Sequence, residues 1–233
     1  MIPLKDENPT KKKCYTRFII LFICVVVFFF QISSHETNLI TYYFGFKPAS
    51  FFNNFDKPTF SPALTLLTSI FMHGGWMHLI GNMMYLIIFA DNVEDVFGTK
   101  KFILFYLLSG IFASFSQAFM DFSSEIPMIG ASGAIAGVLG AYLFYFPRAK
   151  ILVLVPFFIF FTIRVPASIL LIFWFVFQFL NLSNVESSVA WMAHIGGFVF
   201  GYIFSIINGK KPSSKRGSSI FLKKKKDHGI KLT

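Results

Sequence analysis

Residues 129–137 read IGASGAIAG, a run of small residues that contains one hydroxyl, at Ser132, in a chain dominated by Phe, Leu and Ile. Of the 233 residues, 55% are hydrophobic, 34 are Phe and only 14% are charged. So few charges cannot cover a water-soluble globule of this size. The composition therefore predicts a polytopic membrane protein of the all-α class, in which the polar atom of Ser132 needs an explanation.

Apolar segments that approach the roughly 20 residues of a spanning helix recur along the chain. They predict six transmembrane helices, over residues 16–33, 78–97, 102–122, 132–146, 165–181 and 189–208. The apolar run ILVLVPFFIFFTIRVP (151–166) is broken by Pro156, Arg164 and Pro166, so we interpret it as an interfacial connection. A seventh helix is the alternative.

Lys and Arg supply a test of the six-helix count, because they collect in cytoplasmic loops. Of the 21 basic residues, only Lys47 and Lys57 fall on the other side of the predicted bundle, which places both termini in the cytoplasm. The chain then divides into a basic segment (1–15), a membrane domain (16–209) and a basic tail (210–233), and both ends are polar enough to be disordered. We expect the net charge of +10 to attract anionic lipid rather than nucleic acid.

Three polar side chains are predicted at one depth in the membrane. Counted at 1.5 Å per residue from the cytoplasmic helix ends, Ser132 and His194 lie roughly 22 Å, and Asn82 roughly 24 Å, into a hydrocarbon core of roughly 30 Å. Polar groups at such depth are costly unless they face a water-filled interior. The three side chains are therefore candidates for one site near the outer leaflet.

Small residues would let two of these helices meet. Gly133 and Gly137 are four residues apart, as are Gly197 and Gly201, so each helix carries a small-xxx-small face. His194 lies three residues before Gly197, on the same stripe. A hydroxyl becomes a nucleophile when a neighbouring base accepts its proton. The serine and the histidine are thus a candidate nucleophile and general base.

Donors for an oxyanion are available in HGGWMHLIGNMMY (73–85), where His78 and Asn82 lie four apart on one helical face. The backbone N–H of Ser132, near a helix N-terminus, would be a further donor. Each of these residues alone is more often a packing or hydrogen-bonding residue. Their conjunction at one depth favours acyl transfer.

The motifs HGGWMHLIGNM (73–83), GASGAIAG (130–137) and AHIGGFVFG (193–201) resemble, in this order, those of the rhomboid family of intramembrane serine proteases. The likeness extends over about residues 18–208, with NVEDVFG (92–98) and RVPASILLIFWF (164–175). It implies a six-helix rhomboid-like bundle with a Ser132–His194 dyad and with His78 and Asn82 in the oxyanion positions. Structural support is expected from His73, Glu94, Gly130, Gly133, Gly137, Gly197 and Gly201.

Two departures from the family pattern concern the surroundings of the dyad. Some members have a Trp-Arg pair in the first outer loop, which residues 36–72 lack, and some have a Tyr one turn after the nucleophile, where this chain has Ala136. The sequence does not indicate an acidic partner for His194. Three acidic residues are predicted in outer loops, where water would solvate them: Asp121, Glu125 and Glu186.

The resemblance implies a serine endopeptidase that cleaves single-span membrane proteins in or near their transmembrane segments, without a metal or another cofactor. Residues 61–75 and 182–190 are candidate walls and gate of a site open to the extracytoplasmic side. An inactive rhomboid-like protein that binds membrane helices is the alternative. A small transporter is disfavoured because the inner helix halves lack polar residues. The short N-terminus, without an Arg-rich presequence, favours a bacterial plasma membrane.

Overall fold

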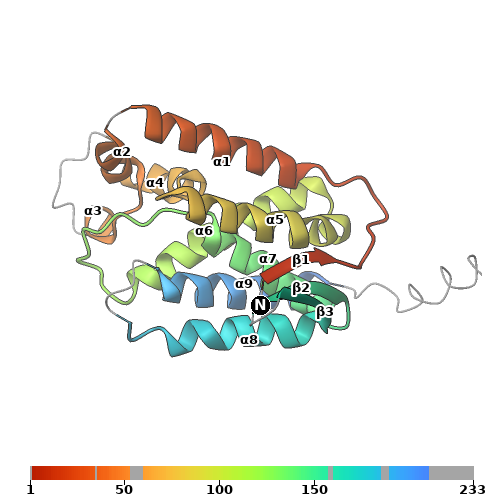
Figure 1. The fold of residues 1–233 in the computed structure, drawn as a ribbon. Helices are drawn as coiled ribbons and strands as arrows, with labels where there is room; N and C mark the ends of the chain where they lie inside the picture. Colours follow the sequence, from red (N-terminus) through yellow and green to blue (C-terminus); the bar gives the residue numbers. More distant parts are fainter. Residues whose placement is uncertain (1, 35, 53–59, 157–159, 185–188, 210–233) are drawn as a thin grey trace, which may run out of the picture.

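The structure is a computed structural model that describes residues 2–34, 36–52, 60–156, 160–184 and 189–209. It is mostly helical, as predicted, and all six apolar segments form helices (Figure 1). Their bounds are α1 Thr16–Ser33, α5 Trp76–Phe97, α6 Thr99–Ala118, α7 Ser132–Tyr145, α8 Ala167–Leu180 and α9 Trp191–Asn208.

Three of the described helices, α1, α6 and α9, are long and apolar enough to cross a membrane. A fourth span is formed if the helices over Pro62–Phe71 are counted together with α5, to which they are bent by 80°. The helices α7 and α8 are apolar but have 14 residues each, so they cover about 21 Å of a core that is about 30 Å thick. The chain is an integral membrane protein, and the count of six spans remains a prediction.

Helix α7 lies inside the bundle and contacts α5, α6, α8 and α9, while α1 packs on the outer side of α5 (Figure 1). The interior is filled by large side chains, among which Phe89, Phe105, Leu139 and Tyr142 are fully buried. Because α7 is surrounded, nearly all its side chains are buried, whereas α1 exposes an apolar face that suits lipid.

Helices α7 and α9 pack backbone against backbone. A Cβ added to Gly197 would lie 2.1 Å from the carbonyl oxygen of Gly133, and one added to Gly140 would lie 2.1 Å from that of Phe198. The missing side chain of Gly133 points elsewhere, toward Ala113 of α6 at 2.6 Å. Small residues therefore bring α7 close to two neighbours at once.

Residues 151–166 connect α7 to α8 as predicted, but the alternative of a seventh helix was wrong, because the described residues of this run form strands. The strands β2 (Lys150–Pro156) and β3 (Phe160–Pro166) make an antiparallel hairpin, and β1 (Ile2–Asp6) pairs with β2 to complete a three-stranded sheet. Alternate β2 residues, Ile151 and Val153, are buried against the helices. This period of two within an apolar run is typical of a strand and explains the outcome.

Residues 2–15 are held by specific contacts, contrary to the expectation of disorder for the N-terminal segment. Besides the β1 pairing, Asp95 of α5 accepts hydrogen bonds from the backbone N–H groups of Lys11 and Lys12, at 2.9 and 3.1 Å. Arg164 of β3 forms an ion pair with Glu7 at 2.6 Å. Polar partners at the helix ends thus compensate the lack of apolar residues. The tail 210–233 lies outside the described residues.

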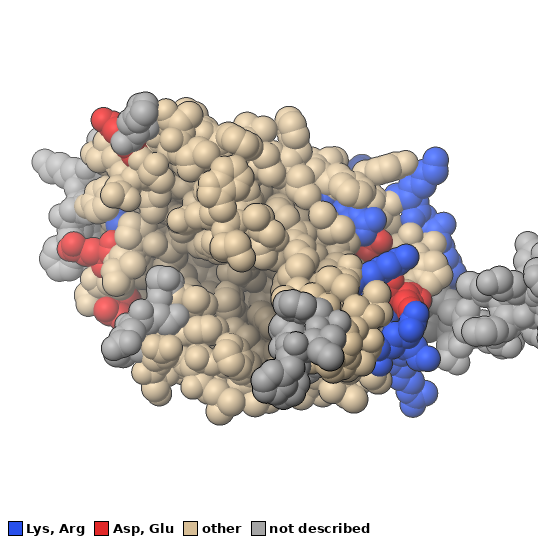
Figure 2. All heavy atoms as spheres, viewed as in Figure 1, with Lys and Arg blue, Asp and Glu red and all other residues tan. Residues whose placement is uncertain are grey.

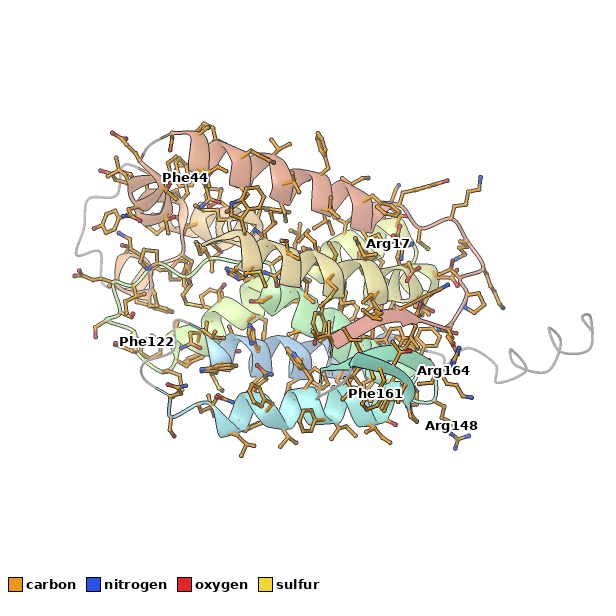
Figure 3. All side chains as sticks on the ribbon, in the orientation of Figure 1. Arg17, Phe44, Phe122, Arg148, Phe161 and Arg164 are labelled. Carbon is orange, nitrogen blue, oxygen red and sulfur yellow. The ribbon has the colours of Figure 1, made fainter. Side chains whose placement is uncertain are left out.

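Basic residues gather at one end of the molecule, around the sheet, and the face in view between the two ends is almost free of charge (Figure 2). Arg148 and Arg164 point outward at this end (Figure 3), whereas Arg17 forms an ion pair with Asp91 of α5 at 2.6 Å. At the other end, the ammonium of Lys47 lies 3.3 Å from the ring centroid of Tyr42. This polarity has the form that the sequence predicts for a membrane protein with its basic end in the cytoplasm.

The first outer loop is built from short helices: α2 Thr37–Phe44, α3 Pro48–Phe52, α4 Pro62–Thr68 and the 3-10 turn η1 Ser69–Phe71. Two backbone hydrogen bonds between Phe46 and Met128, of 3.0 and 2.8 Å, join this loop to the segment that leads into α7. The loop thereby lies next to the N-terminal end of α7, where Ser132 is found.

Candidate active site

Ser132 is the first residue of α7, at the opposite end of the helix from Tyr142, which contacts Asp6 of β1. Its backbone N–H belongs to the first turn and has no acceptor within the helix. The preceding turn requires Gly130, which has φ of 128°, a region that L-residues rarely adopt. The serine is only partly buried, so it can be reached from outside the bundle.

His194 lies in the first turn of α9, beside Ser132 on the neighbouring helix. The preceding residue, Ala193, has its carbonyl oxygen 3.9 Å from a Cβ added to Gly133 of α7. No hydrogen bond joins the side chains of Ser132 and His194 among the described residues. Catalytic hydrogen bonds of this kind often form only when substrate is bound. The structure therefore places the two residues on adjoining helix ends without a hydrogen bond between their side chains.

The imidazole of His194 instead contacts a residue that the sequence analysis missed. Its Nδ1 lies 2.9 Å from Oε1 of Gln178, a buried amide on α8. The sequence contains an indication of this contact, because Gln178 is the only strongly polar residue in the helix ASILLIFWFVFQFL. Isolated polar residues in membrane helices usually have a partner on a neighbouring helix.

Two tryptophans flank the imidazole. The ring centroids of Trp174 on α8 and Trp191 on α9 lie 5.8 and 6.1 Å from that of His194. Ala136, where some rhomboids have Tyr, is fully buried and its Cβ lies 3.3 Å from a Cβ added to Gly197. The aromatic neighbours of the histidine therefore come from α8 and α9, because α7 and α9 are too close for a large side chain between them.

The start of α9 is fixed by a second glutamine that was not predicted. Oε1 of Gln117, on α6, accepts hydrogen bonds from the backbone N–H groups of Met192 and Ala193, at 3.0 and 3.2 Å. N–H groups in the first turn of a helix lack the usual acceptor four residues earlier, and that of Ala193 also reaches the carbonyl of Ala190 at 3.1 Å. Gln117 thus caps the turn that carries His194.

His78 and Asn82 lie one turn apart on one face of α5, and His78 faces the turn before α7. Nδ1 of His78 accepts a hydrogen bond from the backbone N–H of Gly74 at 3.3 Å, so a neutral ring carries its proton on Nε2. A Cβ added to Gly130 would lie 2.7 Å from this Nε2 and 3.7 Å from Oγ of Ser132. The ring nitrogen with its proton therefore points to the space beside the serine.

Asn82 has a buried side-chain nitrogen without a hydrogen-bond partner among the described residues. An unpaired buried donor is costly, so it calls for an explanation. A carbonyl oxygen that acquires negative charge beside Ser132 would be a suitable acceptor. Asn82 and His78 thus offer two donors on one face of α5.

The other expected supporting residues lie at two different places. The ring of His73 packs edge-to-face on that of His78, with 5.1 Å between centroids. Glu94 lies at the far end of α5, where its carboxylate accepts hydrogen bonds from the N–H and hydroxyl of Thr16 and the hydroxyl of Thr99. His73 is therefore adjacent to the site, whereas Glu94 ties the starts of α1 and α6 to α5.

Acidic residues do not approach the imidazole within the described ranges. Asp121 and Glu125 are exposed, and hydrogen bonds from Ser123 lower the pKa of the Asp121 carboxyl. Glu186 lies outside the described residues. Across the described part of the chain, no group of three or more His, Cys, Asp or Glu residues is arranged to hold a metal ion.

The candidate wall over residues 61–75 packs directly beside the site. The carbonyl of Ser69 accepts a hydrogen bond of 2.9 Å from the N–H of Gly130, two residues before the serine. Figure 2 shows that this face of the molecule is hollowed between the positions of α5 and α8 in Figure 1. The second candidate, 182–190, lies partly outside the described residues.

Comparison with known proteins gives the family. Residues 62–211, more than half of the chain, match the model of the rhomboid domain. The chain belongs to the rhomboid family, and the motifs at 73–83, 130–137 and 193–201 all fall within the matched region.

Relatives come from bacteria, plants and fungi. Over 137 residues the chain is 34% identical to "Rhomboid protease GluP" of Bacillus subtilis, covering 59% of this chain and 24% of that protein. It is 31% identical over 147 residues to "RHOMBOID-like protein 5" of Arabidopsis thaliana, covering 61% and 43%. "Rhomboid protein 1, mitochondrial" of Saccharomyces cerevisiae is 28% identical over 163 residues, covering 66% and 44%. The chain spans less than half of each of these relatives.

Proposed function

We propose that the chain is an intramembrane serine endopeptidase in which Ser132 is the nucleophile and His194 the general base. The observation that carries the proposal is the position of these residues on the adjoining ends of α7 and α9. The unpaired amide nitrogen of Asn82, one turn after His78 on α5, is consistent with it. Membership of a family with members named as proteases supports it.

The reaction follows from the chemistry of these groups. Oγ of Ser132 adds to the scissile carbonyl while Nε2 of His194 takes its proton. The oxyanion receives hydrogen bonds from Nε2–H of His78, the amide of Asn82 and the backbone N–H of Ser132. Collapse of this intermediate breaks the C–N bond, and His194 gives its proton to the leaving amine. Water, activated by the same histidine, then hydrolyses the acyl-enzyme.

The substrate class follows from the location of the site in a membrane protein. A peptide bond within a helix is shielded by the backbone hydrogen bonds, so a segment that unwinds easily is cleaved most readily. Gly and Pro weaken helices. We therefore propose single-span membrane proteins with such residues near the membrane surface as substrates.

The orientation is part of the proposal. With the basic end in the cytoplasm, Ser132 and His194 lie toward the extracytoplasmic side, and both residues are partly exposed, which provides access for water. The bacterial plasma membrane remains the predicted location, although three relatives are named as mitochondrial. That prediction can be checked by microscopy of a fluorescent fusion.

The second candidate function is a rhomboid-like protein that binds membrane helices without cleaving them. It shares the fold and the hollow face, and would not need an activated serine. The two functions are distinguished by proteoliposomes that contain the chain and a single-span substrate with a Gly-rich juxtamembrane segment. We expect cleavage that Ser132→Ala abolishes. Stable cross-linking of an intact substrate, with the same yield for Ser132→Ala, would favour the binding protein.

A further inference from the structure

His194 has two ring nitrogens, and Nδ1 faces Gln178. Nε2 is therefore the nitrogen that would accept the proton of Ser132, and it can do so only when it carries no proton itself. A neutral imidazole carries its proton on either nitrogen, and the partner of one nitrogen decides the state of the other. In a serine protease with a triad, a carboxylate fills this role. Among the described residues, the partner of Nδ1 is the amide of Gln178.

The orientation of the Gln178 amide is fixed by a second hydrogen bond. Its nitrogen donates to the backbone carbonyl of Trp174, one turn earlier on α8, at 2.6 Å. A carbonyl only accepts, so the NH₂ group must face Trp174 and Oε1 must face His194. Because Oε1 also only accepts, Nδ1 of the imidazole must be the donor.

The surroundings hold this contact in place. Gln178 is 2% exposed, so water does not compete for its oxygen. Trp174, whose carbonyl anchors the amide, also packs beside the imidazole and stacks on Phe198 of α9, with centroids 5.8 and 6.0 Å away. The glutamine and its tryptophan therefore fix both the direction and the proton of the histidine from one face of α8.

We infer that Gln178 is a positioning residue, which holds His194 in the Nδ1–H tautomer and leaves Nε2 bare for the proton of Ser132. The inference rests on the proposed function. It assigns to a neutral amide the part that a carboxylate has in a triad, and it explains how a dyad without a Tyr after the nucleophile can orient its base.

The test combines a spectroscopic measurement with a reaction rate. The ring nitrogens of His194 are observed by ¹⁵N NMR of protein with labelled histidine, assigned by difference from His194→Ala, and reaction with a fluorophosphonate is timed in the same samples. Gln178→Met keeps the length of the side chain without the acceptor, and Gln178→Glu restores an acceptor oxygen. Asn181→Leu is the matched control, because Asn181 also donates to the carbonyl one turn earlier on α8 but does not touch His194.

We expect wild type, Gln178→Glu and Asn181→Leu to show protonated Nδ1 and bare Nε2. Gln178→Met is expected to lose that preference and to react about 10- to 100-fold more slowly, because a misplaced base is worth about this much. Its thermal unfolding should match that of Asn181→Leu.

The inference is overturned if Gln178→Met keeps the Nδ1–H tautomer, or if it loses the tautomer and reacts at the wild-type rate. A wild-type protein that is folded but does not react would instead overturn the proposed function. The tautomer observed in Gln178→Met would still decide whether the glutamine determines which nitrogen of His194 carries the proton. The two failures are therefore distinguishable.

Discussion

A Cβ added to Gly201 of α9 would lie 1.9 Å from the carbonyl oxygen of Gly137 on α7. No side-chain movement can relieve a contact with backbone at this distance, so the helices would have to move apart. The close packing that places His194 beside Ser132 therefore depends on glycine at these positions, because its side chain is a single hydrogen atom.

Gly201→Ala is expected to lower the free energy of unfolding by about 1–3 kcal/mol, the usual cost of overpacking. Thermal unfolding in detergent measures the change. Gly81→Ala on α5 is the control, since an added Cβ there meets nothing within 4 Å, and it should be neutral or stabilising by about 0.5–1 kcal/mol. Equal melting temperatures for the two variants would contradict the packing of α7 on α9.

Asn82→Ala is expected to slow substrate cleavage by about 10²- to 10³-fold, with the fold intact, because it removes a donor to the oxyanion. Removing a buried amide that has no partner in the free protein should cost little stability. Turnover in proteoliposomes and thermal unfolding are measured together. Ile80→Ala, which changes an exposed residue on the same helix, serves as the reference. Turnover of Asn82→Ala equal to that of Ile80→Ala would exclude the oxyanion role.

Glu94→Gln and Thr16→Val are each expected to destabilise the protein by about 1–3 kcal/mol, because buried hydrogen-bonding groups lose their partners. Since the two residues contact each other, the double variant should lose less than the sum of the single losses. A double-mutant cycle on unfolding measures the coupling. Reaction per folded molecule should stay unchanged. A large loss of reactivity at full stability would show that Glu94 acts on the site itself.

Asp6 should make stability depend on pH. Burial raises the pKa of its carboxyl to about 6, from 3.8, despite the hydrogen bonds from Tyr142 and Asn92. The folded state then holds the proton more tightly than the unfolded state, so the contribution of Asp6 to stability is full below about pH 4 and declines as pH rises to about 6.

Asp6→Asn removes this dependence. Relative to wild type, we expect the variant to gain on the order of 1 kcal/mol of stability between pH 4 and pH 7, a value reduced for partial exposure to solvent. Thermal unfolding over this pH range measures the difference. A constant difference between the two proteins across the range would show that Asp6 is not responsible.

The helices and the close packing of α7 on α9 could be predicted from the sequence because both rest on local patterns. Long apolar segments show where the helices lie, and glycines four residues apart indicated the close approach of α7 and α9. Counting residues from the helix ends predicts one level for Ser132, His194 and Asn82, and their roles stay predictions. Each of these inferences uses spacing along a single helix, which the sequence displays directly.

What the sequence did not reveal depends on contacts between distant segments. The strand at Ile2–Asp6 exists because β2 offers an edge and because Asp95 accepts from the N-terminal backbone, and neither partner is visible in the segment itself. To predict the Gln178–His194 contact, one would likewise have to know how α8 and α9 are rotated relative to each other. A single amide in an apolar helix indicates that a partner exists but does not identify it.

The most direct test of the central claim is to locate the adduct of a fluorophosphonate on the purified protein by mass spectrometry. The account predicts one modified residue, Ser132, and loss of the adduct in Ser132→Ala and in His194→Ala, with both variants folded. An adduct on another residue, or modification of Ser132 at the wild-type rate in His194→Ala, would contradict a serine activated by this histidine.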